Sequence, residues 1–155
     1  MSCKDALITK APAVTPDQPV EAVIKNMRKN GVTLVPVVDA DQILVGVFSF
    51  GILLEDTLPV SLAMGGRGGN EDGPVNVRIP AAPGMVKRLQ RSMVSPVSAL
   101  MQRPRNVVHP DTPLESAIRE IREAGGPVPV VERETNKFVG LVSDESVLAA
   151  LEMKA

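Results

Sequence analysis

Residues 36–49 read PVVDADQILVGVFS, and residues 129–143 read PVVERETNKFVGLVS. Both stretches begin with Pro-Val-Val and end with Val-Gly, two apolar residues and Ser. A turn with the pattern Val-x-Pro-Asp-x-Pro followed by Val or Leu precedes each of them, at residues 14–20 and 108–114. The matching blocks keep their order and are offset by 93 or 94 residues. They indicate a duplicated unit of about 55 residues, because a repeat of this length is one supersecondary unit that packs against its neighbour.

A helix pattern follows the Pro-Asp turn in each unit. Apolar residues recur at i, i+3, i+4 and i+7 from Val20 and again from Leu114, as in an amphipathic helix. Pro19 and Pro113 are expected at the first helical position, where the missing N–H costs nothing. Thr112 and Glu115 are expected to form a capping box at the start of the second helix. Gly31 and Gly125 are placed to end the two helices in the left-handed conformation.

Two β-rich runs around a polar turn follow each helix, and an extended piece precedes it. The runs cover 35–38 and 43–48 in the first unit and 128–131 and 138–142 in the second, with the extended pieces at 13–15 and 107–109. Ser49 and Ser143 stand at the N-cap position of a closing helix. Asp144 and Glu145 favour the first turn of the second closing helix. Each unit is therefore predicted to be β-α-β-β-α.

Neither unit can bury its apolar faces alone. We therefore predict an α/β fold in which two β-α-β-β-α repeats pack with pseudo-twofold symmetry. The first motif is assigned to residues 1–58, the linker to 59–96 and the second motif to 97–155. The predicted shared core consists of Val23, Ile24, Met27, Val37, Val47, Ala117, Ile118, Ile121, Val130 and Leu141. The outer helix faces, which we expect to meet a second copy in a homodimer, carry Ile52, Leu53, Val147, Leu148 and Leu151.

The linker contains two different segments. Residues 65–73 are glycine-rich but lack the Gly-Lys-Ser/Thr ending of a phosphate-binding loop, so a flexible surface loop is predicted there. Farther along, Val86, Leu89 and Met93 have helical spacing, and the basic residues beside them are Lys87, Arg88 and Arg91. This helix either packs on the protein with a solvated basic face or docks on a partner.

Composition argues against most catalytic and metal chemistry. The chain has one His, one Cys, no Tyr and no Trp, and neither His109 nor Cys3 has the clustered partners that catalysis or zinc binding needs. The formal net charge of −1 argues against a nucleic-acid partner. The lone cysteine, the polar N-terminus and the lack of a long apolar run fit a cytoplasmic protein. We expect no enzyme, no metal site and no membrane contact.

These features together resemble the CBS (cystathionine-β-synthase) domain, which occurs in pairs. The resemblance rests on the Pro-Val-Val strand, the Val-Gly turn that leads to a serine and a helix, the Pro-Asp turn, and the entering segment 97–101. It implies a cleft between the paired sheets that binds AMP, ADP, ATP or S-adenosylmethionine as a regulatory ligand. It also implies frequent dimerisation and no required cofactor.

The resemblance further implies which residues meet the ligand. In the family's binding pattern a Ser or Thr meets phosphate, and an acid three residues later takes the ribose hydroxyls. Ser49 and Ser143 match the first position, whereas Ile52 and Ser146 replace the acid. Ile52 would leave buried hydroxyls unpaired, at about 1–3 kcal/mol each, so the second cleft is favoured. Its assigned residues are His109, Asp111, Pro127, Val128, Ser143, Ser146, Arg103 and Arg105; the first cleft has Thr15, Val32, Thr33, Leu34 and Ser49.

Each assignment has a purely structural alternative. The serines serve equally as helix caps, residues 32–34 and 126–128 as strand entries packed in the core, and the two arginines as solvated loop charges. For the whole chain, the leading hypothesis is a nucleotide-responsive regulator that acts through an effector protein. The alternative is a ligand-free dimerisation scaffold whose clefts have lost their ligand.

Overall fold

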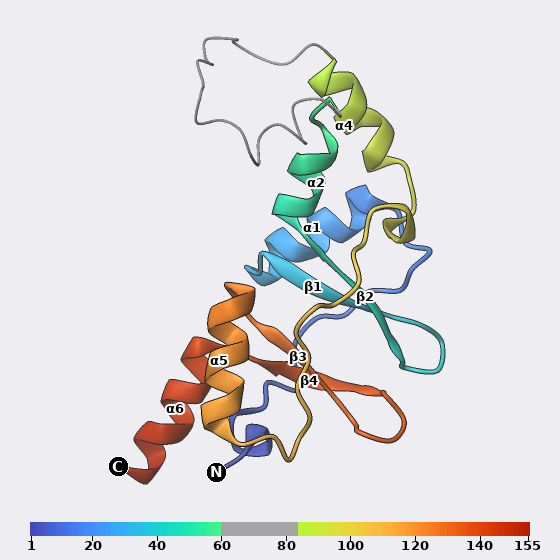
Figure 1. Ribbon diagram of the computed structural model, residues 1–155. Coiled ribbons are helices and arrows are strands. Elements are labelled where there is room, and N and C mark those ends of the chain that lie inside the picture. The colour runs from blue at the N-terminus through green and yellow to red at the C-terminus, as the bar shows by residue number, and fades with distance from the viewer. Residues whose placement is uncertain (60–83) are drawn as a thin grey trace, which may run out of the picture.

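Each half of the chain forms a β-hairpin flanked by two helices (Figure 1). The computed structural model describes residues 1–59 and 84–155, so the predicted loop at 65–73 lies outside the described residues. In chain order the elements are η1 (Cys3–Ala6), α1 (Val20–Asn30), β1 (Leu34–Val38), β2 (Leu44–Ser49), α2 (Phe50–Asp56), α4 (Met85–Met93), η4 (Val97–Ala99), α5 (Leu114–Ala124), β3 (Val128–Val131), β4 (Phe138–Val142) and α6 (Asp144–Lys154).

The strands form two antiparallel hairpins, β1 with β2 and β3 with β4. The extended piece before each helix adds one parallel bridge to the first strand of its hairpin, Val14 to Val37 and Val108 to Val130. The hairpins meet at their turns, where the Phe138 amide donates to the Gln42 carbonyl over 2.8 Å. The predicted order β-α-β-β-α is confirmed, with the first β element of each repeat reduced to that bridge.

The helix ends follow most of the predicted signals. Ser49 and Ser143 are N-caps, and their hydroxyl oxygens accept hydrogen bonds from the amides three residues later at 3.1 and 3.2 Å. Gly31 and Gly125 end α1 and α5 with φ angles of 66° and 77°, the left-handed conformation that glycine adopts without strain.

The capping box predicted for Thr112 and Glu115 is wrong. The Thr112 hydroxyl oxygen instead accepts a hydrogen bond from the His109 amide at 2.9 Å, which closes the Pro-Asp turn. Pro113 occupies the N-cap position rather than the first helical one, and α5 begins at Leu114. Pro19 and α1 show the same one-residue difference.

Each repeat has its own core cluster, so the predicted shared core is replaced by two separate ones. Eight of the ten predicted core residues are buried, whereas Val47 is half-buried and Ile118 is 41% exposed. The predicted outer faces also need correction, because Leu53 and Val147 are 7% and 4% exposed. Within residues 1–59 and 84–155, no helix is long and apolar enough to cross a membrane.

The two repeats exchange the segments that precede them. The Cys3 amide donates to the Thr112 carbonyl, and Ile8 pairs with Leu141 of β4, so residues 1–8 lie on the second repeat. The equivalent bonds recur 94 residues later: the Val97 amide donates to the Gln18 carbonyl, and Gln102 pairs with Val47 of β2. Each repeat is therefore completed by chain from the other, which is why neither is a self-sufficient unit.

The Cys3 side chain reports whether segment 1–8 is docked. Cys3 is fully buried in the core of the second repeat, and burial, with a smaller contribution from the Asp111 carboxylate, raises the pKa of its thiol to about 11. We expect the folded protein at pH 8 to react with a thiol reagent at least about a hundredfold more slowly than the urea-unfolded chain, because only the thiolate reacts and its ordinary pKa is about 8.5. Stopped-flow absorbance with Ellman's reagent measures both rates. Equal rates would mean that the segment is undocked most of the time.

Candidate ligand-binding clefts

Two clefts of similar size lie where the repeats meet. We name them by the serine that each contains: the Ser49 cleft has a volume of about 420 Å³ and the Ser143 cleft about 410 Å³. Both volumes lie within the range of small-molecule sites, roughly 300–1,000 Å³. Because the repeats exchange their entering segments, each cleft is lined by residues of both repeats.

The Ser143 cleft combines the end of β4 with chain from the first repeat. Leu141, Ser143 and Pro127 come from the second repeat. The first repeat contributes two stretches, Ile8 to Pro12 and Asn30 to Leu34, from which Ile8, Lys10, Ala11, Pro12, Asn30, Gly31, Val32, Thr33 and Leu34 line the cleft. Among the described residues that line it, Lys10 is the one cationic side chain, and most of these residues are aliphatic.

The Ser49 cleft is the pseudo-twofold counterpart and carries more charge. Its lining from the first repeat is Leu34, Val47, Ser49, Ile52 and Glu55, and from the entering segment it is Gln102, Arg103, Pro104, Arg105 and Asn106. Ala124, Pro127 and Pro129 complete it. Two arginines and one carboxylate thus lie in a cleft with several aliphatic and proline surfaces.

The structure regroups the predicted site residues. Arg103 and Arg105, which we assigned to the second cleft with Ser143, line the Ser49 cleft instead. Conversely, residues 32–34, assigned to the first cleft with Ser49, line the Ser143 cleft, and Leu34 reaches both. Pro127 also lines both clefts, whereas Val128 is fully buried and lines neither. The segment exchange accounts for Arg103 and Arg105, because they directly follow Gln102, which pairs with Val47 of the first repeat.

The Ser146 hydroxyl already makes hydrogen bonds to the backbone of Ser143. It accepts a hydrogen bond from the Ser143 amide at 2.9 Å and donates to the Ser143 carbonyl at 3.2 Å, and together with the Ser143 side chain it forms a reciprocal cap on α6. Ser146 is not among the residues that line the Ser143 cleft. The advantage that we assigned to it over Ile52 as a ribose partner is therefore lost.

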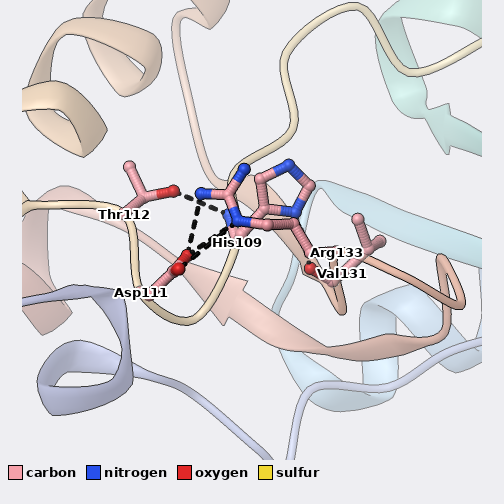
Figure 2. Close-up of polar contacts among 5 residues, drawn as sticks. All are labelled: His109, Asp111, Thr112, Val131 and Arg133. Carbon is pink, nitrogen blue, oxygen red and sulfur yellow. Dashed lines mark hydrogen bonds and ion pairs between the residues drawn. The ribbon is translucent and has the colours of Figure 1, made fainter.

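His109, Asp111 and Thr15 lie away from both clefts. The His109 Nδ1 is 2.9 Å from the Val131 carbonyl oxygen, so Nδ1 carries the proton and donates (Figure 2). Asp111 forms an exposed ion pair with Arg133 at 2.9 Å, and the hydrogen bonds from Arg133 lower the pKa of the Asp111 carboxyl. These contacts tie the Pro-Asp turn to the end of β3. Thr15, the counterpart of His109, donates instead to Asp17 at 2.7 Å.

Electrostatics distinguishes the two clefts. In the described part of the chain, neither Arg103 nor Arg105 makes a hydrogen bond or ion pair with another residue, so both guanidinium groups are available to an anion. In the Ser143 cleft the one cation among the described lining residues is Lys10, and the first turn of the neighbouring α6 carries Asp144 and Glu145. An anionic ligand group is therefore better placed in the Ser49 cleft.

Sequence reasoning missed several polar cleft residues. These are Lys10 and Asn30 in the Ser143 cleft and Glu55, Gln102 and Asn106 in the Ser49 cleft. The 94-residue offset pairs Ile8 with Gln102, and it could have indicated that segments 8–12 and 102–106 hold equivalent places. Among residues 1–59 and 84–155 there is no group of three or more His, Cys, Asp or Glu side chains that would hold a metal ion.

The fold and the paired clefts define a class of protein, a tandem α/β repeat module with two related clefts. A family model described as "CBS domain" matches residues 3–56 and 97–153, well over half of the chain. The chain therefore belongs to the CBS domain family. A comparison with curated proteins found no match.

Solved structures of CBS-pair proteins have the same fold. CBSX2 from Arabidopsis thaliana is 24% identical, with a TM-score of 0.71 over 99% of this chain and 96% of that one. The structure of CBSX2 in complex with AMP is 25% identical, with a TM-score of 0.69 and 99% coverage of both chains. The CBS domain of a CBS domain-containing membrane protein from Sphaerobacter thermophilus is 23% identical, with a TM-score of 0.65 over 97% of this chain and 87% of that one.

Proposed function

We propose that this protein is a regulatory module that binds an adenosine ligand in the Ser49 cleft and acts through a partner protein. The observation that carries the proposal is a pair of arginines, Arg103 and Arg105, that have no hydrogen-bond or ion-pair partner among residues 1–59 and 84–155 and that line a cleft of about 420 Å³. Guanidinium groups pair with phosphate or carboxylate oxygens in a bidentate manner. That chemistry suits AMP, ADP and ATP through their phosphates and S-adenosylmethionine through its carboxylate.

The walls of the Ser49 cleft suit the remainder of such a ligand. Aliphatic and proline surfaces are provided by Leu34, Val47, Ile52, Pro104, Pro127 and Pro129. An adenine ring between surfaces of this kind gains free energy from dispersion and from apolar area removed from water. The AMP complex of CBSX2 supports an adenosine ligand for this fold.

The ribose hydroxyls of a ligand in this cleft need an acceptor other than Ile52, because an isoleucine side chain cannot accept a hydrogen bond. Glu55 follows Ile52 by one helical turn on α2 and lines the same cleft. Its carboxylate accepts hydrogen bonds from two neighbouring hydroxyls, as a ribose offers. We assign Glu55 to the ribose, Ser49 and the arginines to the anionic group, and the aliphatic wall to adenine.

The test is a calorimetric titration with AMP, ADP, ATP and S-adenosylmethionine. We expect at least one of them to bind, and replacement of both arginines (Arg103→Ala with Arg105→Ala) to weaken its affinity at least about tenfold, because one hydrogen bond to a charged group contributes about 1.5–3 kcal/mol and 1.4 kcal/mol is tenfold. The matched control is Lys10→Ala, which removes the cation of the Ser143 cleft and should leave the affinity unchanged.

The opposite pattern would reassign the site. Loss of binding in Lys10→Ala with retention in the double arginine variant would move the ligand to the Ser143 cleft. Absence of binding for all four compounds at millimolar concentration would favour the second candidate, a ligand-free interaction scaffold. That candidate is motivated by the lack of an acid at Ile52 and Ser146.

A further inference from the structure

The stretch of chain that carries the two cleft arginines, residues 103–107, has little backbone support. At one end Gln102 pairs with Val47, and at the other Val108 pairs with Val130. Between these two bridges, no backbone amide or carbonyl of residues 103–107 makes a hydrogen bond within the part of the chain that the structure describes. The positions of the guanidinium groups therefore depend on what else holds this stretch.

One side chain of the stretch is anchored, and its anchor lies on α5. The Asn106 side-chain amide donates to the Glu120 carboxylate at 2.8 Å, and a longer contact reaches the Glu123 carboxylate at 3.4 Å. A carboxylate acceptor makes such a bond stronger than one between two neutral groups. Asn106 directly follows Arg105 and lines the Ser49 cleft itself. The bond to Glu120 thus fixes the backbone next to a cleft guanidinium group.

The equivalent stretch of the first repeat, residues 9–13, has no such anchor. By the 94-residue offset, Pro12 corresponds to Asn106 and Asn26 corresponds to Glu120. Pro12 has no side-chain donor, and the Asn26 side-chain oxygen accepts a hydrogen bond from its own helix instead. Residues 9–13 nevertheless run between two bridges of the same kind as those that flank residues 103–107. The fold therefore forms this part of the chain without a side-chain anchor.

The anchor is present where the arginines are present. The positions equivalent to Arg103 and Arg105 are Thr9 and Ala11, which carry no charge. A flexible backbone beneath two long cationic side chains would have to be ordered when a ligand binds, and that ordering lowers the affinity. A stretch that is held in place beforehand avoids much of this loss. The difference between the repeats is thus explained by the arginines and not by the fold.

We propose that Asn106 is a positioning residue of the Ser49 cleft. Through its hydrogen bond to Glu120, it holds residues 103–107 so that the guanidinium groups of Arg103 and Arg105 meet the anionic group of the ligand. The inference rests on the proposed function, because it concerns the affinity of the same cleft. It also makes a claim about the chain without ligand, namely that the stretch is anchored to α5, and this claim is tested separately.

The first experiment is a calorimetric titration with AMP and with adenosine, which differ by the phosphate alone. AMP should bind the wild-type protein at least about tenfold more tightly than adenosine does. Asn106→Ala should lower this ratio of affinities at least about threefold, because the phosphate meets less ordered arginines. The affinity for adenosine should stay unchanged, which a general disturbance of the cleft would not allow.

Variants of Glu120 separate the hydrogen bond from the charge. Glu120→Gln and Glu120→Ala both remove the negative charge, but glutamine keeps an acceptor for the Asn106 amide. The ratio of AMP to adenosine affinity should therefore be at least about threefold lower in Glu120→Ala than in Glu120→Gln. The matched control is Asn26→Ala, which changes the equivalent position of the first repeat and should leave the ratio at its wild-type value.

The second experiment needs no ligand. Trypsin cleaves after arginine but not before proline, so the bond between Arg105 and Asn106 is its one site within residues 103–107. The initial rate of cleavage at this bond under native conditions, measured by mass spectrometry, reports how often the stretch opens. We expect Glu120→Ala to be cleaved there at least about threefold faster than Glu120→Gln, and Asn26→Ala to be cleaved at the wild-type rate.

Equal cleavage rates in Glu120→Ala and Glu120→Gln would overturn the inference whether or not a ligand binds. An unchanged ratio of affinities in Asn106→Ala would also overturn it, as would an equal loss of affinity for AMP and adenosine. If the wild-type protein bound no AMP while Glu120→Ala was still cleaved faster, the proposed function would fail and the anchoring of residues 103–107 to α5 would stand.

Discussion

Replacement of Phe48 by alanine is expected to lower the free energy of unfolding by about 3–5 kcal/mol. Phe48 is fully buried in the core cluster of the first repeat, and it directly precedes Ser49 at the end of β2. Truncation removes buried apolar area and leaves a cavity, because the surrounding strands and helices relax only in part. Urea denaturation followed by circular dichroism measures the change.

Phe48→Leu is the matched control. It keeps most of the volume and should cost less than about 1.5 kcal/mol. We expect both variants to unfold in a single transition, since residues 1–8 complete the second repeat and residues 97–102 complete the first. A biphasic transition in Phe48→Ala, with one repeat unfolding first, would contradict this coupling. A loss below 1 kcal/mol would contradict the packing of Phe48.

Replacement of Gly140 by alanine is expected to cost about 3 kcal/mol. A Cβ atom at Gly140 would lie 2.4 Å from the Ile8 carbonyl oxygen, a backbone atom that the Leu141 amide already binds. The backbone of segment 1–8 must then move away from β4. We expect the variant to expose Cys3 as well as to unfold at lower urea concentration, so its thiol should react faster than in the wild type.

Gly46, the counterpart of Gly140, provides an internal comparison. A Cβ atom there would meet the Met101 sulfur at 2.6 Å, which is the far part of a flexible side chain, and the Gln102 carbonyl oxygen only at 3.2 Å. Met101 can change rotamer, so Gly46→Ala should cost about 1 kcal/mol. Equal losses for the two alanine variants would mean that segment 1–8 is no tighter against its sheet than segment 97–102.

The two candidate functions differ in what the cleft serines do. Ser49 and Ser143 are both satisfied as helix caps, so their presence alone is explained without a ligand. The arginines are not explained in this way, because Arg103 and Arg105 have no protein partner in the described ranges, and they are the residues on which the ligand proposal depends.

Local signals in the sequence determined the architecture. The repeat, the order of its elements and the helix ends at Ser49, Ser143, Gly31 and Gly125 could be predicted because each depends on residues close together in the chain. The capping box at Thr112 failed although it was local, since the same hydroxyl had a competing partner in the preceding turn, the His109 amide.

Only the tertiary structure decided how the sites are assembled. The sequence offset shows that segments 8–12 and 102–106 are equivalent. The offset does not show whether each segment packs on its own repeat or on the other, because its value is the same in both cases. Exchange between the repeats depends on long-range contacts. Because of it, Arg103 and Arg105 line the Ser49 cleft and not the Ser143 cleft to which we had assigned them. The equivalent residues Ile24 and Ile118 also differ in exposure, at 3% and 41%. Leu89 and Met93 of α4 pack against the core cluster that contains Ile24. Because α4 lies outside the repeated unit, the sequence of the repeat does not predict this difference.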